Sequence, residues 1–303
     1  MSSPQIALAP DDAPPWLRDA ITAGGGTLVV PEAAEGLVWF SPMEPEALRP
    51  VLASSPARWV QLPWAGVEPY LPMLTPDRLW TCGKGVYAEA TGEHALALAL
   101  AMLRDLPRRV RAGRWEPRSG VSLFDRRVTI VGGGGIGEVL LRLLAPFRCE
   151  VTVVRRRVQP MEGAAAVVGP ERLHDALATA DVVFLSLPLT PDTAGIIGRA
   201  ELECMRPDAV LVNVARGAHV VTDDLLAALH AGTIAGAALD VTDPEPLPDD
   251  HPLWREPRCL ITPHTANTVE MVEASIIERV RENVRRFGAG EPLIGVVDLE
   301  LGY

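Results

Sequence analysis

The chain has 303 residues, which is enough for two domains of ordinary size, each able to bury a core. Its 28 basic and 39 acidic residues give a formal net charge of −11, which argues against a general electrostatic attraction to nucleic acid or to anionic membranes. The sequence shows neither a secretory signal nor an apolar run long enough to span a membrane, so we expect a cytoplasmic protein.

The first ninety or so residues alternate short apolar segments with proline-rich joints and helix-like pieces. This alternation predicts a small α/β unit with a parallel sheet. The expected strands are Ile6–Ala9, Thr27–Val30, Leu37–Phe40 and Trp59–Leu62, and the expected helices are Trp16–Ala23 and Pro45–Ala53.

A long helical pattern follows from Glu93 to Trp115, and its first half is apolar nearly all round, which is typical of a buried helix. Its basic run also suggests a nucleic-acid surface. Stacking aromatic residues are not interleaved with the arginines and the chain is acidic, so a solvated or subunit-facing helix is favoured. The run comprises Arg104, Arg108, Arg109, Arg111, Arg114 and Arg118.

From Arg127 onward, strand-like and helix-like segments alternate, which predicts a doubly wound parallel sheet with ligands at the C-terminal strand ends. An amphipathic helix, Val269 to Phe287, comes after this series. Two long helices thus bracket the series, so we expect two Rossmann-like α/β domains. A dinucleotide-binding domain, 99–277, is inserted in a discontinuous substrate domain, 1–98 and 278–303. The expected strands end near Val131, Val154, Leu187, Ala215, Val241 and His264.

The stretch VTIVGGGGIGEVLLRLL, from Val128, contains a G-x-G-x-x-G pattern at Gly132, Gly134 and Gly137. In a dinucleotide site, the first glycine allows a sharp turn, the second admits a pyrophosphate, and the third lets helix pack on strand. The N–H groups at the helix start, around Gly135 and Ile136, would then face the phosphates. A tight turn that binds no nucleotide explains the glycines as well, so the context decides.

Four polar residues follow predicted strands, the position at which open α/β sheets carry their ligand-binding and catalytic residues. They are Arg216, Asp240, Glu245 and His264. Arginine offers a planar fork for a carboxylate, histidine exchanges a proton near neutral pH, and a carboxylate favours the imidazolium. Taken singly, each residue has a structural explanation. Arg216 could cap a helix or form an ion pair, Asp240 could form a turn, and His264 could begin a helix. Their coincidence on one rim favours a site that anchors an anionic carbonyl compound and protonates its oxygen as hydride arrives.

The sequence resembles the D-isomer-specific 2-hydroxyacid dehydrogenases over nearly the whole chain. The likeness is strongest from Val128 on and includes NVARG, DPEP and TPH. It implies that Arg216 is the catalytic arginine, that Glu245 strengthens the hold of His264 on its proton, and that His264 is the proton donor. It also places Pro188, Val214 and Asp240 at the cofactor.

The N-terminal likeness is looser. WVQLPWAGVE, from Trp59, resembles the segment whose backbone N–H groups, here around Ala65 and Gly66, bind the substrate carboxylate together with Arg216. GVYAEATGEHALALALAMLR resembles the first inter-domain crossover, so we expect His94 to be structural. The resemblance also implies a homodimer built around the nucleotide-binding domains.

The sequence departs from the dinucleotide-binding pattern at one position, and this position concerns the choice of cofactor. The second strand should end in an acidic residue that binds the adenine ribose, but this chain has VVRRR, with Arg155 and Arg156. Guanidinium groups pair with a 2′-phosphate, which a carboxylate would repel, so NADP(H) is favoured over NAD(H). Incidental, solvated arginines remain the alternative.

These observations predict an NADP(H)-preferring reductase of small 2-oxo acids, of the glyoxylate or hydroxypyruvate type. A nucleotide-sensing, corepressor-like protein of the same fold is the main alternative, although such relatives usually carry partner-binding extensions. A methyltransferase with the same glycine pattern would lack the Arg216, Glu245 and His264 set. We expect no metal, because the cysteines are scattered without metal-ligand spacing and should be reduced, structural thiols: Cys82, Cys149, Cys204 and Cys259.

Overall fold

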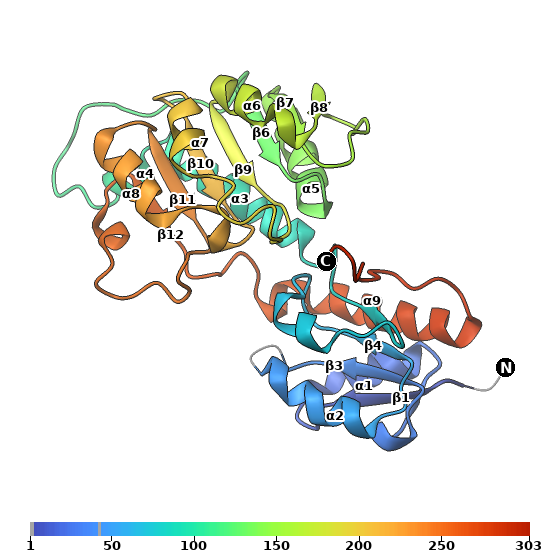
Figure 1. Cartoon of the computed structure of the whole chain (residues 1–303). Helices are drawn as coiled ribbons and strands as arrows, with labels where there is room; N and C mark the ends of the chain where they lie inside the picture. The colour runs from blue at the N-terminus through green and yellow to red at the C-terminus, as the bar shows by residue number, and fades with distance from the viewer. Residues whose placement is uncertain (1–2, 42–43) are drawn as a thin grey trace. The chain divides into compact units, whose positions relative to one another are not determined.

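The structure is a computed structural model that describes residues 3–41 and 44–303. The chain divides into two compact units (Figure 1). The first unit comprises Met1–Tyr87 and Val269–Tyr303, and the second comprises Ala88–Thr268. The expected insertion of one α/β domain into a discontinuous second one is confirmed. The unit boundaries fall earlier in the chain than residues 98 and 277. The helix from Ala88 packs with the second unit, and the helix from Val269 packs with the first.

The first unit contains a five-stranded sheet in which every neighbouring pair is parallel, in the order β2-β1-β3-β4-β5. The strand β5 was not anticipated because it has three residues and no alternating pattern. The strands are β1 (Gln5–Ala9), β2 (Thr27–Leu28), β3 (Gly36–Trp39), β4 (Trp59–Gln61) and β5 (Leu79–Thr81). The helices are α1 (Pro15–Ala23), α2 (Leu48–Ser54) and α9 (Val269–Ala289), with 3-10 turns η1 (Pro31–Ala33), η2 (Pro45–Ala47) and η3 (Glu68–Met73).

Helix α9 belongs to the first unit because one side of it is apolar and packs against α1. Its buried residues recur every three or four positions, the spacing of one helix face. The buried Asn283 on this face is fully hydrogen-bonded, since its amide donates to Gln61 Oε1 and to the Ile294 carbonyl, each at 2.9 Å. The buried set is Val272, Ile276, Val280, Asn283 and Val284.

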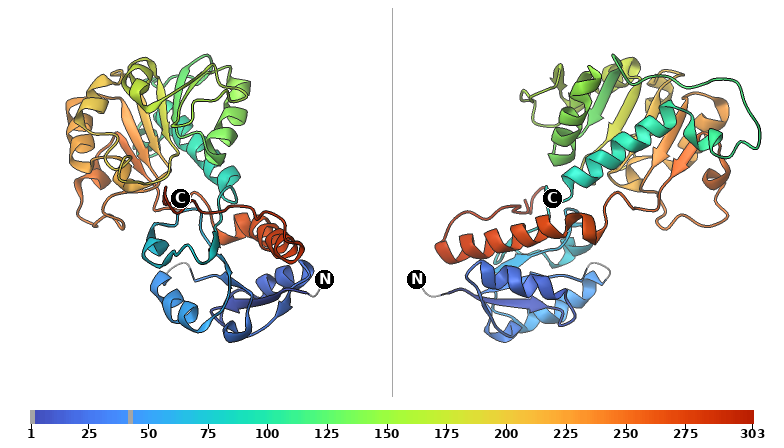
Figure 2. Two further views of the ribbon diagram at one scale, coloured as in Figure 1. Left: turned by 45° about the vertical axis from the view of Figure 1, so that its right-hand side comes forward. Right: turned by 180° about the vertical axis from the view of Figure 1, so that it is seen from behind.

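The second unit contains a seven-stranded parallel sheet in the order β12-β11-β10-β9-β6-β7-β8 (Figure 2). Its strands are β6 (Arg127–Val131), β7 (Glu150–Val154), β8 (Ala166–Val168), β9 (Val182–Leu185), β10 (Val210–Asn213), β11 (Gly236–Leu239) and β12 (Cys259–Ile261). Its helices are α3 (Ala88–Leu103), α4 (Leu106–Arg109), α5 (Gly135–Leu144), α6 (Leu173–Thr179), α7 (Arg199–Cys204) and α8 (Thr222–Ala231). The 3-10 turns are η4 (Ala145–Phe147), η5 (Pro170–Arg172), η6 (Gly217–His219) and η7 (Pro252–Arg255).

Both faces of this sheet are covered, which explains why its strands are apolar at consecutive positions. In β9, Val183 and Leu185 face the core formed with α6, α7 and α8, whereas Val182 and Phe184 face the core formed with α3 and α5. All four side chains are fully buried. This doubly wound arrangement brings the C-terminal ends of the strands to one edge.

The helix expected from Glu93 to Trp115 is wrong in its second half. The helix α3 ends at Leu103, Asp105 has a φ of +56°, and only the short α4 follows. Pro107 is the physical reason, because proline has no N–H to donate to the carbonyl of the preceding turn. Trp115 consequently lies in a non-helical segment with its side chain fully exposed. Among the described residues, no helix has the length and hydropathy needed to cross a membrane.

Candidate active site

The glycine motif lies between β6 and α5, where the sequence predicted it. Gly132 has a φ of +113°, and a Cβ there would lie 2.5 Å from the Ser186 carbonyl oxygen. A Cβ on Gly137 would lie 2.5 Å from the Gly132 carbonyl oxygen, whereas the space beside Gly134 is open. The turn and the helix packing therefore require the first and third glycines, and the second leaves room for a ligand at the start of α5.

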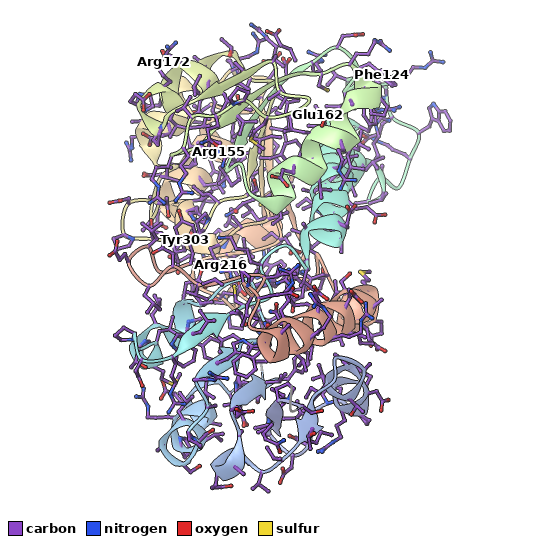
Figure 3. All side chains as sticks on the ribbon, turned by 90° about the vertical axis from the view of Figure 1, so that its right-hand side faces the viewer. Phe124, Arg155, Glu162, Arg172, Arg216 and Tyr303 are labelled. Carbon is purple, nitrogen blue, oxygen red and sulfur yellow. The ribbon has the colours of Figure 1, made fainter. Side chains whose placement is uncertain are left out.

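Arg155 follows β7 and its side chain lies beside the glycine loop (Figure 3). A Cβ on Gly133 would meet Arg155 Cδ at 2.8 Å and Nε at 3.1 Å. Arg156 is the next residue and is exposed. The positive charge at the end of the second strand is thus next to the loop where the phosphates of a dinucleotide would bind.

Arg216 follows β10, and the chain around it is fixed by hydrogen bonds. Asn213, buried at the end of β10, donates from Nδ2 to the Arg216 carbonyl at 2.8 Å and accepts at Oδ1 from the Ala215 N–H at 3.0 Å. The guanidinium Nη1 donates to the Ala215 carbonyl at 2.7 Å. Asn213 lies in the NVARG motif but was not among the predicted site residues.

Glu245 and His264 are brought together although the chain separates them by a strand. Glu245 Oε1 lies 2.6 Å from His264 Nδ1. This hydrogen bond raises the pKa of His264 and lowers that of Glu245, and the nearby Arg216 charge lowers both pKa values. The pair is thus favoured as carboxylate and imidazolium, with Nε2 of His264 as the ring nitrogen that Glu245 does not bind.

His264 lies in a loop, because β12 ends at Ile261 and not at His264 as expected. Its φ is +52°, a conformation that is costly for a non-glycine residue and that persists only where the surroundings impose it. The His264 N–H donates to the Asp240 carbonyl at 2.7 Å and to the Thr262 carbonyl at 2.9 Å. The backbone contacts therefore fix the direction in which the imidazole projects.

Asp240 directly follows β11 and is buried, with 2% of its surface exposed. Its carboxylate accepts from the Thr262 hydroxyl at 2.6 Å and from the N–H groups of Thr265 and Ala266 at 2.9 and 3.0 Å. Burial raises the pKa of this carboxyl, but the hydrogen bonds outweigh burial and leave the pKa below its usual value. Asp240 thus holds the loop that carries His264. Its expected contact with a nicotinamide amide stays a prediction.

His94 on α3 belongs to the same arrangement. Its Nε2 lies 3.0 Å from Thr262 Oγ1 and 3.3 Å from Asp240 Oδ1. These contacts tie α3 to the loop after β12. They agree with the structural role expected for His94.

Gly217, which the sequence analysis missed, joins the arginine loop to the loop that carries Glu245. A Cβ on Gly217 would lie 1.8 Å from the Thr242 carbonyl oxygen, so no other residue fits without moving the backbone. The glycine directly after Arg216 was the available signal. It brings the chain segments of Arg216 and Glu245 into direct backbone contact.

The predicted substrate loop lies in the first unit, after β4. Ala65 is exposed and Gly66 is partly exposed, and among the described residues neither N–H donates to an acceptor. The Trp64 carbonyl accepts from the Gly83 N–H at 2.8 Å, and the Trp64 and Tyr87 rings pack at 5.4 Å. The contacts of Trp64 therefore hold the loop to the rest of the first unit, and the N–H groups of Ala65 and Gly66 remain available to a ligand.

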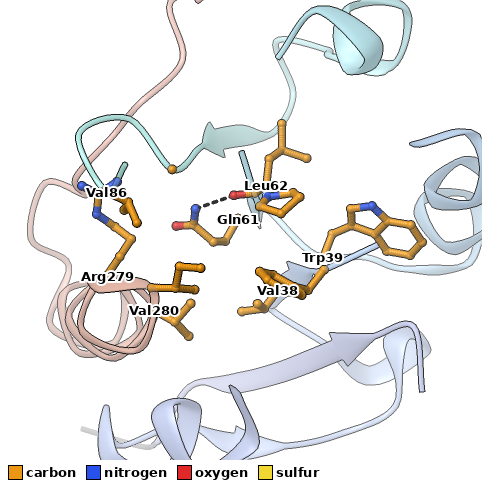
Figure 4. Close-up of a pocket in the computed structure, with 11 residues that line it drawn as sticks. Val38, Trp39, Gln61, Leu62, Val86, Arg279 and Val280 are labelled. Carbon is orange, nitrogen blue, oxygen red and sulfur yellow. Dashed lines mark hydrogen bonds between the residues drawn. The ribbon is translucent and has the colours of Figure 1, made fainter. Parts of the chain in front are cut away.

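A cavity in the first unit lies beside α9 and the ends of β3 and β4 (Figure 4). Its volume of about 10 Å³ holds a single water molecule and no organic acid. Gln61 Nε2 donates to the Leu62 carbonyl at 2.8 Å, and Arg279 donates to the Cys82 and Lys84 carbonyls at 2.8 Å. The polar groups beside this cavity therefore serve the packing of the unit.

The comparisons with known proteins fit this geometry. A family model described as the NAD-binding domain of D-isomer specific 2-hydroxyacid dehydrogenases matches residues 95–266. The chain belongs to this family. It is therefore an oxidoreductase that acts on the CH–OH group of donors, with NAD(P) as cofactor and small 2-hydroxy or 2-oxo acids as the substrates of the family.

Three similar proteins each match nearly the whole chain. A Corynebacterium melassecola protein described as uncharacterized, in the proB 3′ region, is 39% identical over 293 residues, covering 94% of this chain and 95% of that protein. A D-isomer specific 2-hydroxyacid dehydrogenase from Xanthobacter autotrophicus Py2, solved with NADPH and MES, is 29% identical with a TM-score of 0.86 and full coverage of both chains.

The third is an NADPH-dependent glyoxylate/hydroxypyruvate reductase from Sinorhizobium meliloti, solved with NADP and sulfate. It has a TM-score of 0.84 and covers 99% of this chain and 100% of that chain. Its sequence is 24% identical, so this likeness shows the fold alone. The structural comparisons thus extend over both units of the dehydrogenase.

Proposed function

We propose that this dehydrogenase is an NADP(H)-preferring reductase of small 2-oxo acids, of the glyoxylate or hydroxypyruvate type. The observation that carries the proposal is the 2.6 Å hydrogen bond between Glu245 and His264, with Arg216 near enough to lower the pKa of both. A charged imidazole beside a guanidinium suits a substrate that carries a carboxylate and a carbonyl oxygen. The relative from Xanthobacter autotrophicus Py2, which was solved with NADPH, supports the choice of cofactor.

The cofactor would bind along the glycine loop, whose geometry fits a dinucleotide. The open space at Gly134 and the N–H groups of Gly135, Ile136 and Gly137 at the start of α5 would face the pyrophosphate. Arg155 and Arg156 would pair with the 2′-phosphate. Pro188 and Val214, which follow β9 and β10, would line the nicotinamide end.

The residues of the second unit then divide the chemistry of reduction. The bound, reduced cofactor supplies hydride to the keto carbon. Arg216 binds the carboxylate and the carbonyl oxygen. In the first unit, the N–H groups of Ala65 and Gly66 stay the sequence-based proposal for binding a substrate carboxylate. His264 delivers its proton from Nε2 to the oxygen as the C–O double bond becomes single. Glu245 stabilises the imidazolium before the transfer and keeps the ring oriented afterward.

An assay of NADPH consumption at 340 nm with a panel of 2-oxo acids tests the proposal. We expect turnover with glyoxylate or hydroxypyruvate and a higher kcat/KM with NADPH than with NADH. Tight NADPH binding without turnover of any panel member would instead indicate a nucleotide-sensing protein. Faster turnover with NADH would contradict the cofactor assignment.

Replacing Arg155 and Arg156 together by alanine should raise the KM for NADPH far more than the KM for NADH. A charge-assisted hydrogen bond is worth roughly 1.5–3 kcal/mol, so the ratio of the two KM values should change on the order of ten- to a hundredfold. Arg172→Ala is the matched control, because this exposed arginine pairs with Asp175 on the surface of the same unit. Equal effects of the double change on both cofactors would remove the argument for NADP(H).

We extend the proposal to a cytoplasmic homodimer. The family resemblance supports the dimer, and exposed apolar side chains on and after α4 suit a subunit contact. A solution mass of one chain, 32.5 kDa, would contradict it. These side chains are Leu106, Val110, Trp115, Val121 and Phe124.

A further inference from the structure

His219 is a fully buried histidine that takes no part in the proposed proton and hydride transfer. It lies in the η6 turn, three residues after Arg216, and none of its surface is exposed. Its Nδ1 lies 3.2 Å from the Arg216 N–H nitrogen, and its Nε2 lies 3.2 Å from the Pro188 carbonyl oxygen. One ring therefore joins the loop after β10 to the loop after β9.

The hydrogen-bonding partners determine the tautomer. The Pro188 carbonyl can only accept, so Nε2 carries the proton and donates it. The Arg216 carbonyl, 3.1 Å from Nδ1, already accepts from Asn213 Nδ2 and from the His219 N–H. Because both lone pairs of that oxygen are used, Nδ1 is left as the acceptor for the Arg216 N–H. The geometry thus favours the tautomer that donates from Nε2 and accepts at Nδ1.

We propose that His219 is a positioning residue, one that holds Arg216 at a fixed distance from the Pro188 segment. This inference rests on the proposed function, in which Arg216 binds the 2-oxo acid and Pro188 lines the nicotinamide. The Pro188 carbonyl also accepts from the Thr193 hydroxyl at 2.8 Å, so the segment that His219 contacts is itself held in place. The two nitrogens of one imidazole would thus set the distance between the loop that binds the 2-oxo acid and the loop that lines the nicotinamide.

The size of the expected effect follows from the geometry of hydride transfer. Reacting atoms must come within about 3–3.5 Å, and a misplacement of about 1 Å can cost on the order of a hundredfold in rate. Loss of a tether between the two loops should therefore lower kcat and leave the KM for NADPH nearly unchanged, because the hydrogen bonds of the ring go to Pro188 and to Arg216 rather than to the glycine loop. A purely structural role would lower the melting temperature without changing kcat per folded molecule.

Three replacements separate the two ends of the ring. His219→Phe keeps an aromatic ring, a somewhat larger one, and removes both contacts. We expect kcat to fall about tenfold to a hundredfold, with a larger primary isotope effect from deuterated NADPH. His219→Asn keeps an acceptor at the Nδ1 position, and His219→Gln keeps a donor at the Nε2 position, so each should recover part of kcat. His174→Gln is the matched control, since His174 is exposed and pairs with Glu201.

Wild-type kcat and isotope effect in a folded His219→Phe enzyme would overturn the positioning role. Equal losses in all three variants would also overturn it, because the two polar variants retain one contact each. The nitrogen-15 chemical shifts of the His219 ring test the tether without turnover: we expect a protonated Nε2 and an unprotonated Nδ1 at neutral pH. A protonated Nδ1 would contradict the tether, whereas a wild-type protein that reduces no 2-oxo acid would contradict the proposed function itself.

Discussion

Replacement of His264 by glutamine is expected to lower the turnover of 2-oxo acids by a factor of about 10²–10⁴, the usual contribution of a positioned general acid. Glutamine preserves much of the size of the side chain and can still approach Glu245, but it has no proton to deliver to the carbonyl oxygen. The affinity for NADPH should stay close to that of the wild type, because no backbone hydrogen bond among the described residues joins the glycine loop before α5 to His264 or its loop.

Two measurements check this expectation: kcat at 340 nm, and the Kd for NADPH from fluorescence titration. The same change at an exposed histidine, His174→Gln, is the control for unspecific effects. Turnover like that of the wild type in His264→Gln would end the assignment of the proton donor. A large loss of NADPH affinity would show that the residue acts through the cofactor.

The sequence allowed the fold of the second unit, and the approach of Glu245 to His264, to be predicted for a physical reason. In a parallel sheet every strand ends at the same edge, so polar residues directly after strands meet although they are far apart in the chain. Arg216, Glu245 and His264 were found in this way, and the hydrogen bond between the last two joins loops after different strands. The glycine pattern before α5 also lies where it was expected.

Other features could not be read from local patterns. Strands β5 and β8 have three residues each, too few to show an alternation. The helix predicted to Trp115 ended at Leu103, because one proline outweighed a favourable composition around it. Tertiary hydrogen bonds decide the contacts of Asp240, since its donors lie in a loop more than twenty residues away.

The position of His219 between two loops could not be predicted from local sequence patterns either. A single histidine in a turn is no signal in a sequence, and its importance appears only when Pro188 and Arg216 are seen on either side of the ring. Gly217 was readable in principle, because a glycine directly after a functional residue often marks a close backbone approach. The structure shows that approach against Thr242.

Replacement of Glu245 by glutamine should change the pH dependence of catalysis in a direction that the pKa shifts fix. The hydrogen bond from Glu245 raises the pKa of His264, and burial opposes this effect. Glutamine still accepts the Nδ1 hydrogen bond but carries no charge, so the pKa of His264 should fall. Reduction needs the protonated ring, and its activity is lost as pH rises through that pKa. Oxidation of a 2-hydroxy acid needs the neutral ring and has the opposite requirement.

The central claim is that Glu245 keeps His264 charged so that it can protonate the substrate beside Arg216. The most direct test is the pH profile of kcat/KM for wild-type and Glu245→Gln enzyme, measured in both directions. We predict that the alkaline limb of reduction moves to lower pH in the variant, and that oxidation by the variant persists to lower pH than in the wild type. Identical profiles for the two enzymes, in either direction, would contradict the account.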